Sequence, residues 1–259
     1  MESVSKKIIF ASDFHLGVEA TLSSEEREKK VVEWLTRIQD EIEALYLVGD
    51  IFDYWFEYNS CIPKGFTRFL GKIAELRDAN IPIYFFTGNH DMWMFDYFEN
   101  EFGIPVYHKP IQKEIQGKKL FIGHGDGLGP KDYGYKFIKK VLSNPFCQWA
   151  YARLHPNFGL WLMKKFSHKS RDAGGDNAIF QGRDKEMLVQ YAERKLESLE
   201  VDYFVFGHRH LPLKVTLSNK RSIYYGIGDW THYQSFGVLQ DGKFSLQYYE
   251  RPDLTQIIE

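Results

Sequence analysis

The stretch Thr87-Gly88-Asn89-His90-Asp91 follows the apolar run Ile83-Tyr84-Phe85-Phe86 and places an amide, an imidazole and a carboxylate just beyond it. The run is typical of a buried strand, and a glycine at its end lets the backbone turn sharply. In α/β proteins, ligands bind at the carboxyl edge of such strands. The stretch therefore indicates a ligand or metal site at the edge of a sheet.

Four other parts of the sequence repeat this arrangement of an apolar run followed by metal-type residues. They are residues 8–11 before Asp13-Phe14-His15, residues 45–48 before Gly49-Asp50, residues 120–122 before Gly123-His124, and residues 203–206 before Gly207-His208-Arg209-His210. Each motif alone is more often structural, because a histidine after a strand or a Gly-Asn turn is common. Five motifs at the same structural place make coincidence improbable. We therefore predict that five strands aim these side chains at one metal site.

The residue types favour a centre with two metal ions. Two divalent ions held roughly 3.5 to 4 Å apart can stabilise both the attacking and the leaving oxygen of an in-line displacement at phosphorus. Asp50 is the predicted bridging carboxylate, with Asp13, His15 and His210 on one ion and Asn89, His124 and His208 on the other. Oxygen and imidazole ligands without thiolate favour Mn²⁺, Mg²⁺, Fe²⁺ or Zn²⁺. The residues alone do not select among these ions.

The order of the expected elements is typical of an α/β fold. Ser23 and Glu26 have capping-box spacing, and a helix is predicted over residues 24–41. Helical periodicity over residues 66–76 precedes the strand at residues 83–86, so strands and helices alternate as in a mainly parallel sheet. A later helix is predicted over residues 184–199. The end of the chain is expected to form strands at residues 213–217, 222–225, 236–240 and 243–249, with a two-residue hairpin turn at Asp241-Gly242.

Residues from about 130 to 182 break this alternation with short helical pieces. We expect one domain, residues 1–259, with this segment as a helical lid. Residues 131–171 hold nine basic side chains and one acid: Lys131, Lys136, Lys139, Lys140, Arg153, Lys164, Lys165, Lys169 and Arg171 against Asp132. Aromatic residues, Trp161 among them, are interleaved. They either cap the core, bind acyl chains beside an anionic membrane, or stack on nucleic acid.

Composition restricts the partners and the compartment. A net charge of −2 and a pI near 6.5 argue against a surface built for nucleic acid. Cys61 and Cys147 are the two cysteines of the chain, which suits a reducing compartment. Residues 1–7 carry no long apolar run, and no window of about 18 apolar residues occurs. We therefore expect a cytoplasmic protein whose membrane contact, if present, is peripheral.

The five motifs together resemble the signature of the calcineurin-like metallophosphoesterases. The motifs are Asp13-x-His15, Gly49-Asp50-x-x-Asp53, Gly88-Asn89-His90-Asp91, Gly123-His124 and Gly207-His208-x-His210. The resemblance reaches about Trp230 and implies a four-layer α-β-β-α sandwich, a binuclear centre and the same seven ligands. It also implies that His90 assists the leaving group. Asp53 and Asp91 either orient a ligand or imidazole from behind, or serve as caps or surface turns.

Further residues are similar to the UDP-2,3-diacylglucosamine pyrophosphohydrolase family of lipid A biosynthesis. They are Gly49-Asp50-x-Phe52-x-x-Trp55, His124-Gly125-Asp126-x-Leu128, Asp132, Tyr135 and Gly228-Asp229-Trp230. This resemblance implies hydrolysis of UDP-2,3-diacylglucosamine to UMP and 2,3-diacylglucosamine 1-phosphate, usually with Mn²⁺, at the cytoplasmic face of the inner membrane. That family commonly has arginine where this chain has His90. We expect substrate contacts at Asn89, His90, Asp132, Tyr135 and Trp161.

Two alternatives remain open at this point. The first is a metallophosphoesterase acting on a soluble nucleotide, phosphodiester or phosphoprotein, which would not need an apolar lid. The second is a non-catalytic scaffold that keeps the fold to bind partners. The aromatic insertion argues against the first alternative, and the complete set of ligand-type residues argues against the second.

Overall fold

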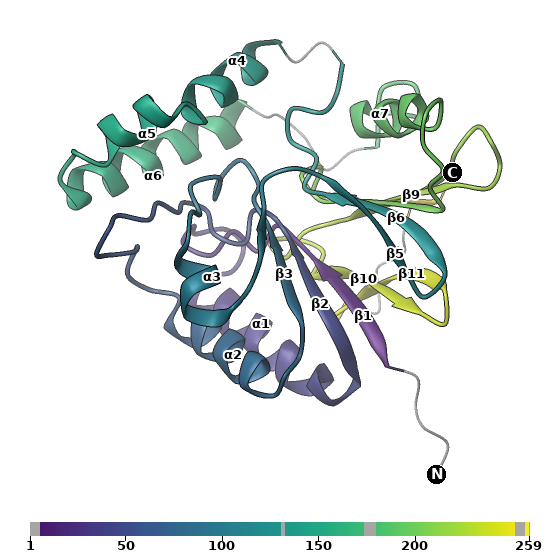
Figure 1. The fold of residues 1–259 in the computed structure, drawn as a ribbon, viewed down its shortest axis with the longest axis horizontal. Helices are drawn as coiled ribbons and strands as arrows, with labels where there is room; N and C mark the ends of the chain where they lie inside the picture. Colours follow the sequence, from purple (N-terminus) through teal and green to yellow (C-terminus); the bar gives the residue numbers. More distant parts are fainter. Residues whose placement is uncertain (1–5, 131–132, 174–179, 252–256, 259) are drawn as a thin grey trace.

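The computed structural model describes residues 6–130, 133–173, 180–251 and 257–258, with side chains up to residue 167 in the second range. The first of its two sheets has the order β11-β10-β1-β2-β3-β4 (Figure 1). Strands β1 to β4 are parallel, and β10 and β11 are antiparallel to their neighbours. The bounds are β1 (Lys7–Ala11), β2 (Ile42–Val48), β3 (Ile83–Phe86), β4 (Val106–Tyr107), β10 (Ser235–Gln240) and β11 (Lys243–Tyr248).

The second sheet has the order β12-β8-β9-β7-β6-β5. Strands β6, β7 and β9 are parallel, β5 is antiparallel to β6, β8 is antiparallel to β9, and β12 is parallel to β8. The bounds are β5 (Ile111–Ile115), β6 (Lys118–Gly123), β7 (Tyr203–Phe206), β8 (Pro212–Thr216), β9 (Ile223–Ile227) and β12 (Ile257–Ile258). The parallel strands of both sheets therefore deliver the residues that follow them to one edge of the molecule.

Helices cover the outer face of each sheet. Helices α1 (Ser24–Ile38), α2 (Thr67–Asp78) and α3 (Tyr97–Phe102) pack on the first sheet, and α7 (Met187–Lys195) packs on the second (Figure 1). Between the sheets lies a core that includes the buried side chains of Phe10, Val48, Ile122 and Val205. This is the predicted four-layer α-β-β-α sandwich, and the prediction is confirmed.

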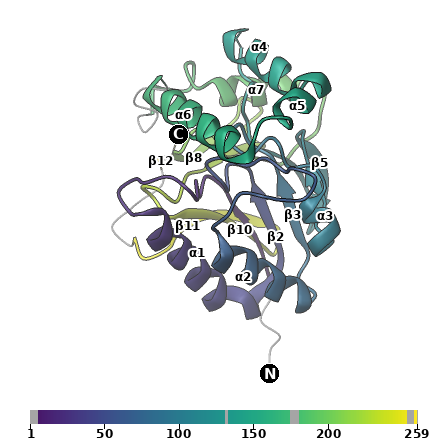
Figure 2. The same ribbon diagram turned by 90° about the vertical axis from the view of Figure 1, so that its left-hand side faces the viewer.

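Three helices between β6 and α7 lie over the edge where β1, β2 and β3 end (Figure 2). They are α4 (Tyr133–Leu142), α5 (Pro145–Tyr151) and α6 (Pro156–Ala173). Asn144 caps α5 by accepting a hydrogen bond from the backbone N–H of Phe146 at 2.9 Å, and Pro145 occupies the first turn. Among the residues that the structure describes, no helix is both long and apolar enough to cross a membrane.

Local signals predicted several element boundaries and missed others. The capping box of Ser23 and Glu26 starts α1, but the α-helix ends at Ile38 and continues as a 3₁₀ turn over Gln39–Glu41. Asp241 and Gly242 have φ values of 51° and 72°, which confirms the predicted tight hairpin. The sequence did not predict α3, β4, β5 or β12. The six residues of α3 are too few to show a helical period, and the turn between β5 and β6 lacks the usual asparagine or aspartate.

Candidate metal centre

The predicted ligands lie at the carboxyl ends of five parallel strands. Asp13 and His15 follow β1, Asp50 follows β2, Asn89 follows β3, His124 follows β6, and His208 and His210 follow β7. Because these ends meet at one edge of the sandwich, side chains far apart in sequence come together. The six acidic and imidazole ligands form two groups, in each of which the candidate ligand atoms lie within 4.8 Å of one another.

The first group holds Asp13, His15 and His210. His210 Nε2 lies 3.2 Å from Asp13 Oδ1 and 3.2 Å from His15 Nε2. All three ligand atoms therefore point into one small volume, as the sequence predicted for one of the two ions.

The second group holds Asp50, His124 and His208. Asp50 Oδ2 lies 3.1 Å from His124 Nε2 and 4.0 Å from His15 Nε2 of the first group. Asp50 thus stands between the groups, where a bridging carboxylate belongs. The backbone N–H of His90 donates to Asp50 Oδ1 at 2.8 Å, which places the Asn89-His90 turn against this carboxylate.

The glycines of the motifs leave room for the ligands. A Cβ at Gly207 would stand 2.6 Å from Asp13 Oδ2, and one at Gly49 would stand 2.6 Å from His124 Nδ1. A Cβ at Gly88 would overlap Asp50 Oδ1. Any larger residue at these positions would displace a ligand, which explains in steric terms why glycine precedes the metal-type residues.

Five of the ligand residues have left-handed backbone conformations. Their φ values are 54° at Asp13, 45° at His15, 52° at Asp50, 65° at His208 and 52° at His210. Such conformations are unfavourable for residues with a side chain and are typical of functional sites. The surrounding structure holds them in place: the buried guanidinium of Arg27 donates to the carbonyls of Phe14 and His15 at 2.7 and 2.6 Å.

Three of the histidines have an acceptor close to their Nδ1 atoms, although His15 Nδ1 does not form a hydrogen bond with its neighbour. His124 Nδ1 lies 2.9 Å from the carbonyl of Val48, His15 Nδ1 lies 3.3 Å from Asp53 Oδ1, and His210 Nδ1 lies 3.3 Å from Asp229 Oδ2. Each neighbour is an acceptor, which favours hydrogen on Nδ1 and leaves Nε2 on the inner side of the ring, where a metal ion would bind. Asp53 is therefore a buried partner of a candidate ligand and not a surface cap.

Asp91 is fully buried and connects the two turns that carry Asn89 and Asp50. Its carboxylate accepts hydrogen bonds from the backbone N–H groups of Gly88 at 2.7 Å and Ile51 at 2.8 Å. It thereby ties the Asn89 turn to the Asp50 turn. Burial and the nearby charge of Asp50 raise the pKa of Asp91 to about 7.

The charges of the centre are strongly coupled. Burial favours the neutral forms, yet the Asp50 carboxylate raises the pKa of His124 to about 10. Burial together with the charge of His124 lowers the pKa of His208 to about 4. The histidines in turn hold the pKa of Asp50 below its usual range against the effect of burial. Asp50 is thus an anion at neutral pH.

Unpaired polar atoms show that divalent cations fit this cluster. Asp13 Oδ1, Asn89 Oδ1 and His124 Nε2 are buried and have no hydrogen-bond partner among the described residues. Buried polar atoms without a partner are costly and need an explanation. Carboxylate, amide and imidazole atoms are the donors that Mn²⁺ and similar ions accept, so bound cations would satisfy all three atoms.

His90 lies beside the centre and contacts the insertion. Its Nδ1 is 3.1 Å from the backbone oxygen of Asp53 and 3.1 Å from Ser167 Oγ of α6. Ser167 also donates to Asp53 Oδ2 at 2.7 Å. Ser167 could not be selected from the sequence, because one serine inside a helical segment carries no motif. Asp229 was also missed as a site residue, although it follows β9 and Gly228 just as the other motif residues follow their strands.

An apolar cavity of about 670 Å³ opens beside these residues. Its polar end is formed by Asp53, Asn89, His90 and Ser167. Its walls include apolar side chains of the three insertion helices: Ile138, Leu142, Tyr151, Leu162, Met163 and Phe166. The insertion helices and one candidate ligand, Asn89, therefore line the same cavity.

The predicted substrate residues are placed differently from one another. Asn89, His90 and Tyr135 line this cavity, and the Tyr135 hydroxyl donates to Asp126 Oδ2 at 2.6 Å. Trp161 is 53% exposed and does not line the cavity. Asp132 and Lys131 lie outside the described residues, as do the side chains of Lys169 and Arg171.

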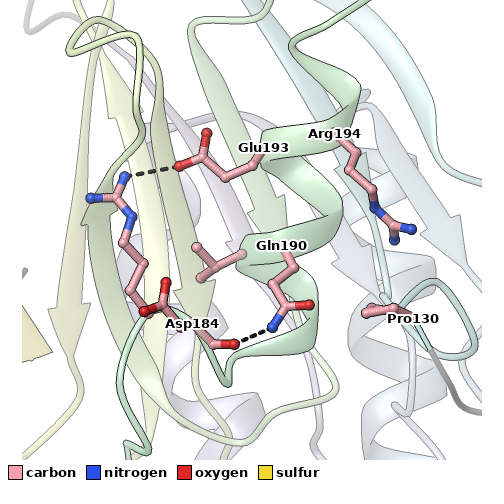
Figure 3. Close-up of a pocket in the computed structure, with 7 residues that line it drawn as sticks. Pro130, Asp184, Gln190, Glu193 and Arg194 are labelled. Carbon is pink, nitrogen blue, oxygen red and sulfur yellow. Dashed lines mark hydrogen bonds and ion pairs between the residues drawn. The ribbon is translucent and has the colours of Figure 1, made fainter.

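A second cavity, of about 320 Å³, lies beside α7 and contains none of the predicted site residues. Its lining includes Pro130, Asp184, Gln190, Glu193 and Arg194 (Figure 3). Glu193 Oε1 forms an ion pair with Arg183 Nη2 at 2.9 Å.

Comparison with known proteins identifies the family. The family described as calcineurin-like phosphoesterase matches residues 6–212, a span that includes all seven predicted ligands. The chain belongs to the calcineurin-like phosphoesterase family. The resemblance inferred from the five motifs, and the prediction that the chain is a phosphoesterase, are thereby confirmed.

Curated relatives of this calcineurin-like phosphoesterase share one name, UDP-2,3-diacylglucosamine hydrolase. The relative from Porphyromonas gingivalis is 38% identical and aligns over 90% of this chain and 93% of its own length. The relative from Psychromonas ingrahamii is 25% identical over 93% and 96% of the two chains. The relative from Vibrio parahaemolyticus is 26% identical over 94% and 98%.

Proposed function

We propose that this phosphoesterase hydrolyses the pyrophosphate of UDP-2,3-diacylglucosamine to give UMP and 2,3-diacylglucosamine 1-phosphate, a step of lipid A biosynthesis. The observation that carries the proposal is the cavity of about 670 Å³, whose polar end holds Asn89 and His90 and whose walls are apolar. A lipid nucleotide likewise has a polar part, the nucleotide pyrophosphate, and an apolar part, the acyl chains. The shared name of the curated relatives supports this substrate.

Asp13, His15 and His210 would hold one divalent cation, Asn89, His124 and His208 a second, and Asp50 would bridge them. When bound, two such ions activate water and neutralise the charge that develops on the phosphate oxygens. Asp50 is a permanent anion between the two groups. Asp53 would orient His15, and Asp91 would hold the Asp50 turn through its hydrogen bond to Ile51.

His90 would protonate or polarise the leaving oxygen. It lines the cavity, and its Nδ1 faces the backbone oxygen of Asp53, which accepts a hydrogen. The Nε2 atom is therefore the one left to act on the substrate. Burial lowers the pKa of His90, so its protonated form is a stronger proton donor to the leaving oxygen than an ordinary imidazolium.

Helices α4, α5 and α6 would act as a lid within a single domain. Tyr133, Phe137, Phe146, Trp149, Phe158, Trp161 and Phe166 are each between 51% and 76% exposed on these helices. So large an apolar surface is typical of a membrane or partner contact. Lys136, Lys140, Lys164 and Lys165 lie on the same helices and would meet an anionic leaflet at about 1 kcal/mol per lysine near the surface. The protein would then sit peripherally on the cytoplasmic face of the inner membrane, with Trp161 in the lipid.

Liposome co-sedimentation tests this membrane contact. We expect binding to vesicles with anionic phospholipid at low salt and release at high salt, and weaker binding to zwitterionic vesicles. Trp161→Glu should weaken binding and raise KM for the diacylated substrate while sparing a small diester. Met187→Glu changes an exposed apolar residue on α7, which lies outside the three insertion helices, and serves as the control. Equal effects of both variants would contradict the lid and membrane role.

The substrate is tested by a thin-layer assay with Mn²⁺, which compares UDP-2,3-diacylglucosamine with a generic aryl phosphodiester. Release of UMP from the lipid nucleotide, with slow turnover of the diester, is the expected result. Efficient turnover of the diester alone would favour a phosphoesterase for soluble nucleotides, phosphodiesters or phosphoproteins. Mn²⁺ is the proposed ion, and the same assay with Mg²⁺, Fe²⁺ and Zn²⁺ ranks the alternatives.

A further inference from the structure

Asp229 is a buried carboxylate that faces the candidate centre from a sixth strand. It follows β9 and Gly228, and its side chain is fully buried. The next residue, Trp230, donates its backbone N–H to the carbonyl of Asp13 at 3.1 Å. The turn that carries Asp229 is therefore attached to the turn that carries Asp13.

The two oxygens of Asp229 have different partners. Oδ1 accepts hydrogen bonds from the backbone N–H groups of His232 at 3.1 Å and Tyr233 at 3.0 Å. Oδ2 lies 3.3 Å from His210 Nδ1 and 2.8 Å from His232 Nδ1, and it also accepts the hydroxyl hydrogen of Thr231. The two backbone bonds fix the orientation of the carboxylate, so Oδ2 must face His210.

His210 can bind a metal ion only through Nε2, the atom that lies among Asp13 and His15. That nitrogen must be unprotonated to act as a ligand, so the neutral imidazole must carry its hydrogen on Nδ1. Asp229 Oδ2 is the acceptor that favours this tautomer. We propose that Asp229 is a positioning residue that fixes the tautomer of His210 and thereby sets the metal affinity of the group of Asp13, His15 and His210.

The second metal group does not depend on Asp229. His124 Nδ1 is held by the backbone carbonyl of Val48 at 2.9 Å. A backbone acceptor cannot be removed by exchanging a side chain. The proposal therefore separates the two groups: a change at Asp229 weakens one and leaves the group of Asp50, His124 and His208 in place.

Asp229→Asn is the variant that tests the tautomer. The asparagine oxygen keeps the two backbone N–H bonds, so its NH₂ group takes the place of Oδ2 and faces His210 Nδ1. A donor at this place favours the tautomer with hydrogen on Nε2, which cannot bind a metal ion. Asp241→Asn, in the hairpin between β10 and β11, is the matched control, because asparagine before glycine suits such a turn.

The readout is Mn²⁺ binding to chelator-treated protein, followed by electron paramagnetic resonance of the free ion. We expect two ions per chain for the unaltered protein and for Asp241→Asn. In Asp229→Asn one of the two affinities should fall by about 10- to 100-fold, the usual effect of removing such a partner. The metal-free variant should keep the far-UV circular dichroism spectrum of the folded protein. Excess Mn²⁺ should restore turnover, with KM for the substrate unaltered.

This inference rests on the proposed metal centre, and the experiment separates the two. If the unaltered protein binds no Mn²⁺, the metal centre itself is wrong. If it binds two ions and Asp229→Asn binds them with the same affinities, only the role of Asp229 is wrong. Loss of both ions together with loss of the folded circular dichroism spectrum would make Asp229 a general structural residue and would also overturn the proposal.

Discussion

Ser167 of α6 donates its hydroxyl hydrogen to Asp53 Oδ2 at 2.7 Å. The other oxygen of Asp53 lies 3.3 Å from Nδ1 of His15, so one carboxylate joins an insertion helix to a candidate metal ligand. Ser167 Oγ also lies 3.1 Å from His90 Nδ1. The position of α6 and the orientation of two active-site imidazoles are therefore linked through a single buried network.

Removal of the Ser167 hydroxyl should lower the free energy of unfolding. Ser167→Ala deletes a buried hydrogen bond to a charged group, and such bonds contribute about 1.5 to 3 kcal/mol. We expect the free energy of unfolding, measured with denaturant, to fall by about that amount. Ser198→Ala removes an exposed hydroxyl and should change it by less than about 0.5 kcal/mol. The same small change in both variants would mean that α6 is not held by this bond.

Asp50→Ala should abolish binding of both metal ions. Asp50 Oδ2 lies near His124 Nε2 and His15 Nε2, which belong to different groups. Asn89→Ala alters one group and should retain the ion of the other. Elemental analysis after dialysis against Mn²⁺ gives the metal content of each variant. Two ions per chain in Asp50→Ala would show that this carboxylate does not bridge.

His90→Ala should keep both metal ions and lose turnover. The proposed role of His90 is proton transfer to the leaving oxygen, and general acid catalysis contributes roughly 10² to 10⁴-fold. Steady-state kinetics with saturating Mn²⁺ should show this loss in kcat. A variant that loses an ion, as judged by elemental analysis, would instead make His90 a ligand.

Gly88→Ala should disturb the metal site because its Cβ would overlap Asp50 Oδ1. We expect weaker Mn²⁺ binding and lower activity. Gly71→Ala provides the control: Gly71 lies in α2, where a Cβ would meet no atom within 4 Å. Alanine favours a helix over glycine, so this variant should gain roughly 0.5 to 1 kcal/mol in unfolding free energy. If Gly88→Ala binds Mn²⁺ normally, the turn is more adaptable than its packing indicates.

Local patterns predicted the α/β class and the candidate centre, whereas the four-layer sandwich was implied by the resemblance to the calcineurin-like metallophosphoesterases. Motifs such as Gly49-Asp50 and Gly207-His208-x-His210 indicate where a strand ends and also supply the candidate ligands that follow it. Parallel strands then bring those ends to one edge. The clustering of Asp13, His15 and His210 needed only these two facts.

Long-range contacts were beyond such reasoning. Ser167 meets Asp53 across 114 positions in the sequence, and its own surroundings in α6 have no distinguishing pattern. Strand β5 pairs through a Gln116-Gly117 turn whose φ values of 48° and 69° are usually supplied by asparagine or aspartate. Tertiary packing determines both the contact of Ser167 and the conformation of this turn, and the local residues predict neither.

The left-handed backbone lowers the thermal stability of the protein at five positions, which are Asp13, His15, Asp50, His208 and His210. Each such residue costs roughly 1 to 2 kcal/mol, in a molecule class whose whole stability is about 5 to 15 kcal/mol. Selection for survival at higher temperature would gain most from glycine at these turns, yet every such exchange deletes a ligand atom. Adaptation to heat must therefore come from remote positions such as Gly71, while the turns themselves stay fixed for as long as the chemistry is needed.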